Sequence, residues 1–254
     1  MQPQKDYASK INKILKQIYT VKGLEEMTKV AEELLKSKQC KSDENFRNIV
    51  HGEVCETVLE CYLDNYITIN NLEGIWFYEK GVVLKDMTNP DSEYLTEVDM
   101  TLFTPFKLLT FECKCYGGGK LVVDECKIVR KGIKPYDVFA QHKKHIETLM
   151  NNLYRFRLDT EYSRAYSPID AAYFDFSLGN ITDKRDASWK KKMPVLNVEN
   201  LYEHLDNYRG KPECWNITGL KRGVAAITKY KEILRKKHLR YVKELNRKRE
   251  SKKK

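Results

Sequence analysis

Apolar residues return at helical spacing over the first quarter of the chain. Residues 7–36 contain two such runs with Gly23 between them, and they predict two amphipathic helices. A third run predicts a helix over residues 42–63, where a polar residue is available to cap the first turn. The chain therefore opens with helices.

Alternating apolar and polar residues take over in the middle of the chain. Residues 66–85 predict a pair of strands, and residues 96–115 predict a β-hairpin with a proline at its turn. Because successive side chains of a strand point to opposite faces, Val98, Met100 and Leu102 are expected to share one face of the hairpin. The remaining elements are a helix at 136–156, a strand at 169–178, a polar loop at 179–192, a strand at 195–198 and a helix at 201–205.

This order of elements predicts an α/β fold. A mixed β-sheet is expected around the 96–115 hairpin, with helices 42–63 and 136–156 packed against it. We divide the chain into a helical N-terminal addition at 1–41, a main domain at 42–210, and a basic C-terminal helix and tail at 211–254.

Charged side chains gather on the other face of the predicted hairpin. Asp99, Glu112 and Lys114 can converge there if the two strands pair. Mg²⁺ prefers oxygen ligands and usually takes one or two carboxylates, and a neighbouring lysine can offset charge that builds up on a phosphate. The main-chain carbonyl of Cys113 is a further candidate oxygen ligand. The alternative is a solvated sheet face, but residues 108–111 are mostly apolar, so charges beside them need a partner or a metal.

The same residues resemble a known nuclease core. Asp99 followed by Glu112-Cys113-Lys114 resembles the Asp…Glu-x-Lys pattern of the PD-(D/E)XK nuclease superfamily, and more narrowly the nuclease-related domain (NERD) within it. The resemblance implies a restriction-endonuclease-like fold over about residues 44–208. It also implies that Asp99 and Glu112 bind Mg²⁺ or Mn²⁺ and that Lys114 is the catalytic lysine. The sequence departs from the superfamily name at Val98, which stands where that name has a proline.

Two side chains on the flanking helices are candidate additions to this site. Glu53 interrupts the apolar stripe of helix 42–63, and the resemblance leads us to expect a helix carrying Gly-Glu ahead of the hairpin. Glu53 would then be a metal ligand or a base, whereas Glu56 is expected to point away. The alternative for Glu53 is an edge position or a salt bridge to a core lysine. Gln141 resembles the glutamine that superfamily members often carry on the helix after the Glu-x-Lys strand, and its alternative is a solvated position.

Histidines and cysteines near the hairpin suggest a zinc site, but their spacing does not favour one. Cys113, Cys115 and Cys126 match no paired Cys-x₂-Cys pattern. Cys113 and Cys115 are instead expected to fill the buried face of their strand. His142 and His145 are expected to be packed core histidines.

Composition narrows the class of protein. The 254 residues are 41% hydrophobic, which is typical of a globular protein, and no apolar run is long enough for a membrane helix. The seven cysteines lack the spacing of a disulfide scaffold and predict reduced thiols. The expected location is therefore cytoplasmic, or nuclear if the host is a eukaryote.

The net charge of +10 is concentrated at the C-terminal end. Residues 221–254 hold fifteen of the 46 Lys and Arg but three of the 36 Asp and Glu, a local charge of +12. Interleaved apolar residues predict a helix over the first two-thirds of this segment, and residues 246–254 are expected to be disordered. The tail is expected to contact the phosphate backbone of DNA, with RNA as an alternative, and a homodimer is a further alternative for the assembly.

Mg²⁺-dependent cleavage of DNA is therefore the predicted function. Two other classes stay open. One is a nucleic-acid-binding protein that keeps the nuclease fold without turnover. The other is an interaction protein whose basic tail binds RNA or an acidic partner.

Overall fold

The computed structural model describes most of the chain. The described residues are 2–42, 44–85, 95–115, 121–124, 127–130, 133–155, 169–176, 181–214 and 216–251. Cys126, the third cysteine of the zinc alternative, lies outside them. Among the described helices, none combines the length and the apolar character needed to cross a membrane.

Within the described residues, five strands form the central mixed sheet. Their order is β1-β2-β3-β7-β9; β1, β2 and β3 are antiparallel neighbours, while β7 and β9 run parallel to β3. The predicted hairpin and the predicted α/β class with a restriction-endonuclease-like mixed sheet are thus confirmed. The strands are β1 (Phe77–Lys85), β2 (Leu95–Phe103), β3 (Leu108–Lys114), β7 (Ile169–Asp175) and β9 (Val195–Leu196).

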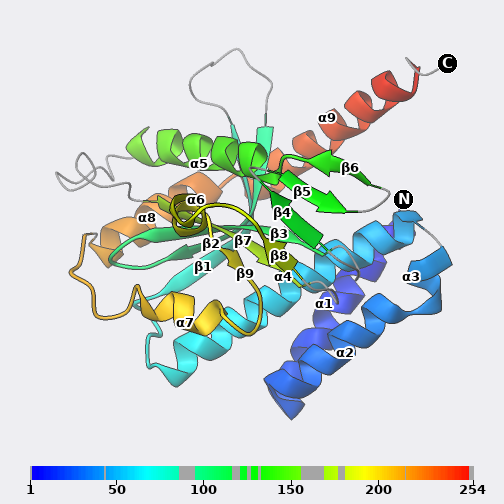
Figure 1. Ribbon diagram of the computed structural model, residues 1–254. Helices are drawn as coiled ribbons and strands as arrows, with labels where there is room; N and C mark the ends of the chain where they lie inside the picture. The colour runs from blue at the N-terminus through cyan, green and yellow to red at the C-terminus, as the bar shows by residue number, and fades with distance from the viewer. Residues whose placement is uncertain are drawn as a thin grey trace.

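Helices cover both faces of this sheet (Figure 1). Helix α4 (Glu44–Ile69) packs on one face, and α5 (Val138–Arg155), where the sequence predicts a helix, packs on the other. The N-terminal helices pack against α4 and extend the apolar core on that side. They are α1 (Gln2–Lys22), α2 (Leu24–Lys36) and α3 (Lys38–Ser42), and the short helix α7 (Leu201–Asp206) completes the same core.

Helix α4 is longer than the sequence predicts. In place of the strand expected near Ile67, the helix continues to Ile69. Leu59, Leu63, Tyr66 and Ile67 are all buried and keep helical spacing, so the apolar stripe of the helix extends through this segment. The hydroxyl of Tyr66 donates to Asp206 at 2.6 Å and ties the end of α4 to α7.

A second, smaller sheet has no counterpart among the predicted elements. Its order is β6-β5-β4-β8, again within the described part of the chain. The expected polar loop at 179–192 instead contains β8 and a short helix, α6, which Asp186 caps by accepting from the Trp189 amide. These elements are β4 (Leu121–Asp124), β5 (Lys127–Arg130), β6 (Ile133–Tyr136), β8 (Ile181–Asp183) and α6 (Ala187–Lys192).

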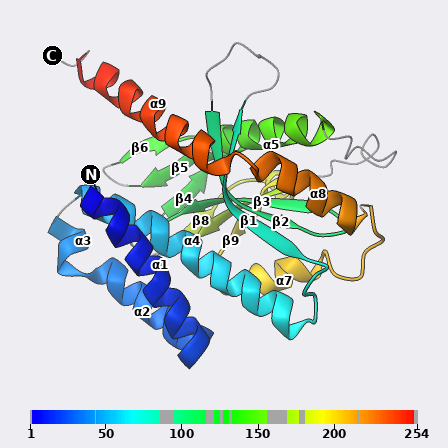
Figure 2. The same ribbon diagram turned by 180° about the vertical axis from the view of Figure 1, so that it is seen from behind.

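Two helices form the C-terminal segment. Helix α8 (Ile217–Thr228) buries Leu220 and Val224 beside α5, and α9 (Lys231–Ser251) begins against β1 and β2. The distal half of α9 extends away from the body (Figures 1 and 2). The disorder expected from residue 246 onward is therefore wrong as far as Ser251, because α9 continues through it.

In β1 and its neighbour β2, the side chains switch from one face of the sheet to the other at the level of Gly81. On one side of this glycine Lys80 reaches the acids of α4, and on the other Val82 packs in the apolar cluster below α5 and α8. Gly81 has a φ of +62°, a conformation that side chains with a Cβ rarely adopt. The neighbouring strand β2 changes faces at the same point, because Met100 packs toward α4 and Val98 packs toward α8. The expectation that Val98 shares a face with Met100 and Leu102 is therefore wrong.

Candidate functional site

The hairpin brings Asp99, Glu112 and Lys114 together. The β2–β3 register pairs Met100 with Phe111, so Asp99 and Glu112 lie one residue further along the two strands. The Cys113 amide donates to Asp99 Oδ2 at 2.8 Å. Lys114 Nζ donates to Glu112 Oε1 at 2.5 Å and lies 3.9 Å from Asp99 Oδ2. We call these three side chains, together with His142 and His145, the carboxylate–histidine centre.

Glu112 is the most enclosed member of this centre. Its side chain is fully buried, and its Oε2 lies 3.2 Å from His145 Nδ1 and 3.7 Å from His142 Nδ1 on α5. Burial by itself would raise the pKa of Glu112. The two histidines and the Lys114 ammonium reverse that effect and hold the pKa below its usual range. Glu112 therefore stays ionised inside the protein.

Asp99 has the opposite electrostatic setting. Burial and the negative charge of Glu112 raise the pKa of Asp99 to about 6, although Lys114 and the Cys113 amide oppose the rise. Two neighbouring carboxylates that affect each other's ionisation are the arrangement that a cation would relieve.

The acids of α4 lie beside this centre but are paired with a lysine. Lys80 Nζ donates to Glu53 Oε1 at 3.0 Å and lies 3.3 Å from Glu56 Oε2. Burial raises the pKa of Glu56 to about 7, and the charge of Asp99 adds to the rise while Lys80 opposes it. Glu56 therefore interacts with Asp99, and the expectation that it points away is wrong. Glu53 forms a salt bridge to a lysine, which is the alternative given for it above.

The other candidates lie on the elements that the sequence predicts for them. Gln141 is half-buried on α5, next to His142. Cys113 is buried on the face that packs against α4. The Cys115 thiol donates to the main-chain oxygen of Phe176 at 3.0 Å. Within the described residues, one group of three or more side chains is close enough together to bind a metal ion. Its members are Glu112, His142 and His145.

The two histidines are what the sequence analysis missed. The sequence predicts packed core histidines, and both are indeed buried, but their rings also face Glu112. Their i, i+3 spacing on the helix that follows the Glu-x-Lys strand is the signal that they share a face.

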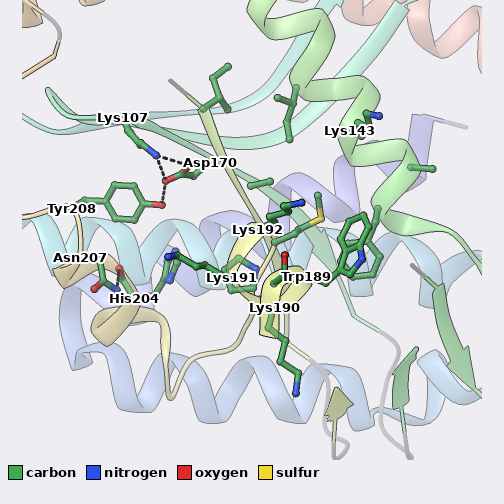
Figure 3. Close-up of a pocket in the computed structure, with 18 of the residues that line it drawn as sticks. Lys107, Lys143, Asp170, Trp189, Lys190, Lys191, Lys192, His204, Asn207 and Tyr208 are labelled. Atoms are coloured by element: carbon green, nitrogen blue, oxygen red, sulfur yellow. Dashed lines mark hydrogen bonds and ion pairs between the residues drawn. The ribbon is translucent and has the colours of Figure 1, made fainter. Parts of the chain in front are cut away.

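A separate hollow of about 1270 Å³ lies at the other end of β3 and β7. Figure 3 shows Lys107 and Lys143 on its upper side and Lys191, Lys192 and Trp189 below them. We call it the lysine-lined pocket. Its walls include Lys107, Lys143, Lys190, Lys191, Lys192, Asp137, Asp170, Trp189, His204 and Tyr208.

Comparison with known proteins gives one match. Residues 52–171 match the family model of the nuclease-related domain. Comparisons with curated proteins and with solved structures give no match. The matched segment begins on α4 and ends on β7, and it contains Asp99, Glu112, Lys114 and both histidines of the centre. Residues 52–171 are therefore similar to the nuclease-related domain (NERD) family, which is consistent with the PD-(D/E)XK-like nuclease family that the hairpin motif predicted.

Proposed function

We propose that this protein is a metal-dependent deoxyribonuclease. The observation that carries the proposal is the position of Lys114, which is hydrogen-bonded to Glu112 and lies 3.9 Å from Asp99. Two carboxylates and an amino group then meet on the inner strands β2 and β3 at a partly exposed position, since Asp99 and Lys114 keep about a fifth to a quarter of their side-chain surface accessible.

The donor set fits a divalent cation. Oε2 of Glu112 is buried without a hydrogen-bond partner, and the partly buried Asp99 lies beside a second negative charge. Asp99, Glu112 and the Cys113 carbonyl would hold Mg²⁺ or Mn²⁺. When bound, such an ion polarises a phosphoryl oxygen and lowers the pKa of a coordinated water.

The protein's own groups supply orientation and charge. Lys114 would stabilise the negative charge that builds up on the phosphate, while its hydrogen bond fixes the Glu112 carboxylate. The Cys113 amide fixes Asp99 in the same way. Glu53 and Glu56 hold Lys80 at the border of the site, and Glu53 stays our candidate for an additional ligand or base. Gln141 is proposed to orient a substrate group from α5.

The basic C-terminal helix is proposed to bind the phosphate backbone. Lys231 pairs with Glu79 and Arg235 pairs with Glu97, each at 3.4 Å, so the first turns of α9 are anchored to β1 and β2. Further along, Lys236, Lys237 and Arg240 are exposed. Basic side chains of this kind neutralise phosphates whatever the base sequence.

A cleavage assay tests the proposal. Purified protein is incubated with mixed single- and double-stranded DNA, and in parallel with RNA, in Mg²⁺, in Mn²⁺ and in chelator. Cleavage of DNA in either metal and none in chelator is expected, together with its loss in Asp99→Asn. DNA binding in chelator without cleavage in any metal would identify the non-catalytic alternative. RNA binding alone would favour the interaction protein.

A further inference from the structure

Three buried side-chain atoms without hydrogen-bond partners face one another behind the hairpin. They are Glu112 Oε2, His142 Nδ1 and His145 Nδ1. The possible ligand atoms of these residues all lie within 4.8 Å of one another. Because an unsatisfied buried polar atom costs free energy, three such atoms at one point indicate that a bridging group belongs between them.

The ring of His142 is held in the tautomer that a metal ligand needs. Its Nε2 lies 3.1 Å from the main-chain oxygen of Thr110, which can only accept, so Nε2 carries the hydrogen. In a neutral ring the lone pair is then on Nδ1, 3.7 Å from Glu112 Oε2, and with a metal bound it would point to the ion instead of Nδ1 donating to the carboxylate. Metal-binding histidines use this arrangement, in which the second ring nitrogen donates to a carbonyl or carboxylate oxygen.

We infer that Glu112, His142 and His145 bind a divalent transition metal of the Zn²⁺ class. Two imidazoles and one carboxylate, with a fourth position left open, are a donor set that zinc sites use, and imidazole nitrogen favours such ions over Mg²⁺. Ligand atoms around a tetrahedral zinc lie about 3.3–3.6 Å apart, because the bonds are about 2.0–2.2 Å long. The distances of 3.2 and 3.7 Å from Glu112 Oε2 to the two imidazoles are close to that spacing.

This position differs from the one proposed for Mg²⁺. Glu112 Oε1 faces Lys114 and the Asp99 side, whereas Oε2 faces the histidines of α5. The inference deepens the proposed function and rests on it for the reaction. A cation at Oε2 would hold the Glu112 carboxylate in place and compensate its buried charge.

Metal titration of the chelator-stripped protein tests this inference without any cleavage assay. Calorimetry with Zn²⁺ is expected to give one ion per chain. Substituting Co²⁺ is expected to give paramagnetically shifted imidazole proton signals. His142→Ala and His145→Ala should each lower Zn²⁺ affinity by at least about 100-fold, since loss of an outer-shell partner alone costs about 10–100-fold. Glu147→Gln, on an exposed position of the same helix, should change it little.

The outcomes separate this inference from the proposed function. Absence of shifted imidazole signals in the wild-type protein overturns the inference, and this readout does not depend on whether the variants fold. Equal affinities for Zn²⁺ in His145→Ala and Glu147→Gln overturn it as well. Zn²⁺ binding without cleavage in Mg²⁺ or Mn²⁺ leaves the inference standing and removes the nuclease. Cleavage without Zn²⁺ binding does the reverse.

A second inference rests on the charges of the lysine-lined pocket. Its acids are already engaged, because Asp170 accepts from Lys107 at 3.0 Å and Asp137 Oδ1 accepts from the Ala140 amide. The three successive lysines 190–192 are exposed on α6. The pocket therefore presents net positive charge, which complements a polyanion.

Trp189 adds an aromatic face to that charge. Its side chain is 41% exposed, and Lys192 Nζ lies 5.6 Å from the ring centroid. Lysines that follow a phosphate backbone and an aromatic ring that stacks on a base are the two parts of a single-strand binding surface. We propose that the lysine-lined pocket binds an unpaired segment of the nucleic-acid substrate, with a base against Trp189 and phosphates against the lysines (Figure 3). A base inside a duplex has no free face for this contact.

The pocket and the carboxylates lie along the same pair of strands. The β3–β7 register pairs the pocket residues Ile169 and Ala171 with Leu108 and Thr110, and it pairs Lys114 with Asp175 at the centre. Leu108 and Lys114 are six residues apart, or about 20 Å, while Glu112 is two residues from Thr110. The proposal rests on the proposed function, since a segment held there would anchor the same strand that the centre cleaves.

Binding of a fluorescent single-stranded oligonucleotide in chelator tests the pocket while cleavage is blocked. Alanine at Lys190, Lys191 and Lys192 together, and separately Trp189→Ala, should each weaken binding about tenfold. Alanine at the exposed Lys10, Lys13 and Lys22 removes the same charge and serves as the matched control. A matched duplex should respond less to Trp189→Ala.

If the two triple variants weaken oligonucleotide binding equally, the proposed role of the pocket is wrong and the loss is a general effect of charge. Binding of a poly-glutamate peptide in place of the oligonucleotide would overturn it in favour of an acidic protein partner. If the oligonucleotide binds through the pocket but no metal supports cleavage, the proposed function fails while the pocket stands.

Discussion

The carboxylate–histidine centre and the lysine-lined pocket are charged in opposite ways. In the centre, Glu112 and both histidines are almost fully buried, and most charged groups lie within 4 Å of an opposite or polar partner. In the pocket, lysines 190–192 are exposed on a helix of six residues. Both contain charge, but the centre encloses its charges and the pocket presents them to solvent.

The two regions also differ in how far apart in the chain their charged residues lie. The centre needs β2, β3 and α5 to meet correctly, because its members are separated by as many as 46 positions in the chain, from Asp99 to His145. The walls of the pocket also come from several elements, but its tryptophan and three of its exposed lysines are consecutive, at residues 189–192. We therefore expect the centre to respond to isosteric changes, whereas the loss of any single lysine from the pocket should have a small effect.

The sharpest test of this contrast is Glu112→Gln. The substitution keeps the shape of the side chain but removes a charge that Lys114 and His145 contact, so we expect turnover to fall on the order of a thousand-fold. Lys191→Gln in the pocket should change turnover less than about twofold. Steady-state cleavage rates for both variants measure this. Similar reductions in turnover for Glu112→Gln and Lys191→Gln would contradict both the difference between the two regions and the role assigned to Glu112.

A second test separates charge from metal binding within the centre. Lys114→Ala should lower turnover about 100-fold, because a positioned donor near a developing charge contributes about 10²–10³-fold. Calorimetric Mg²⁺ titration should show binding that is retained or tightened, since a competing cation has been removed. Loss of Mg²⁺ binding in this variant would mean that Lys114 only supports the site structurally.

The third test concerns the stability of the α4 border. Burial raises the pKa of Glu56 to about 7 from 4.5, so the folded state holds the proton more tightly than the unfolded state. Stability should then fall as pH rises from about 4.5 to about 7, by about 2 kcal/mol after allowance for partial exposure. Glu56→Gln should flatten this dependence in urea unfolding at pH 5 and pH 7.5, with chelator present. An equal fall in the variant would contradict the assignment.

The smallest expected effect comes from the C-terminal end. Deleting residues 246–254 should weaken DNA binding and flatten the slope of log affinity against log salt, by about 0.9 for each duplex phosphate that the shortened protein no longer neutralises. Turnover at saturating DNA should stay the same, because the metal ligands lie elsewhere. Binding isotherms at several salt concentrations measure the slope. If it is unchanged, the tail serves another partner.

Much of the fold could be predicted from the sequence because its signals are local. The hairpin has alternation on both strands and a proline turn, and these specify its pairing. Short β4, β5 and β8 carry three or four residues each, too few for the period to be recognised. The change of face at Gly81 could not be predicted, since glycine also occurs in ordinary strands.

The candidate site was predictable only as far as one hairpin extends. Asp99, Glu112 and Lys114 lie on adjacent strands, so strand geometry alone brings them together. The contact of Glu112 with His142 and His145 depends on how α5 is rotated above the sheet. The same limit applies to Glu56, whose interaction with Asp99 depends on where α4 crosses.

Helix α9 also determines how far from its own surface the protein can meet a nucleic acid. Its 21 residues give a length of about 31 Å, and its ion pairs to Glu79 and Glu97 lie in its first two turns. The remainder is a stiff arm that carries positive charge further from the body than the screening length of about 8 Å at physiological salt, so these charges act on a nucleic acid that the body itself does not yet attract. Such an arm enlarges the target that a diffusing polyanion first encounters. Because Arg235 is tied to Glu97, two residues from Asp99, the arm is attached to the strand that carries the site.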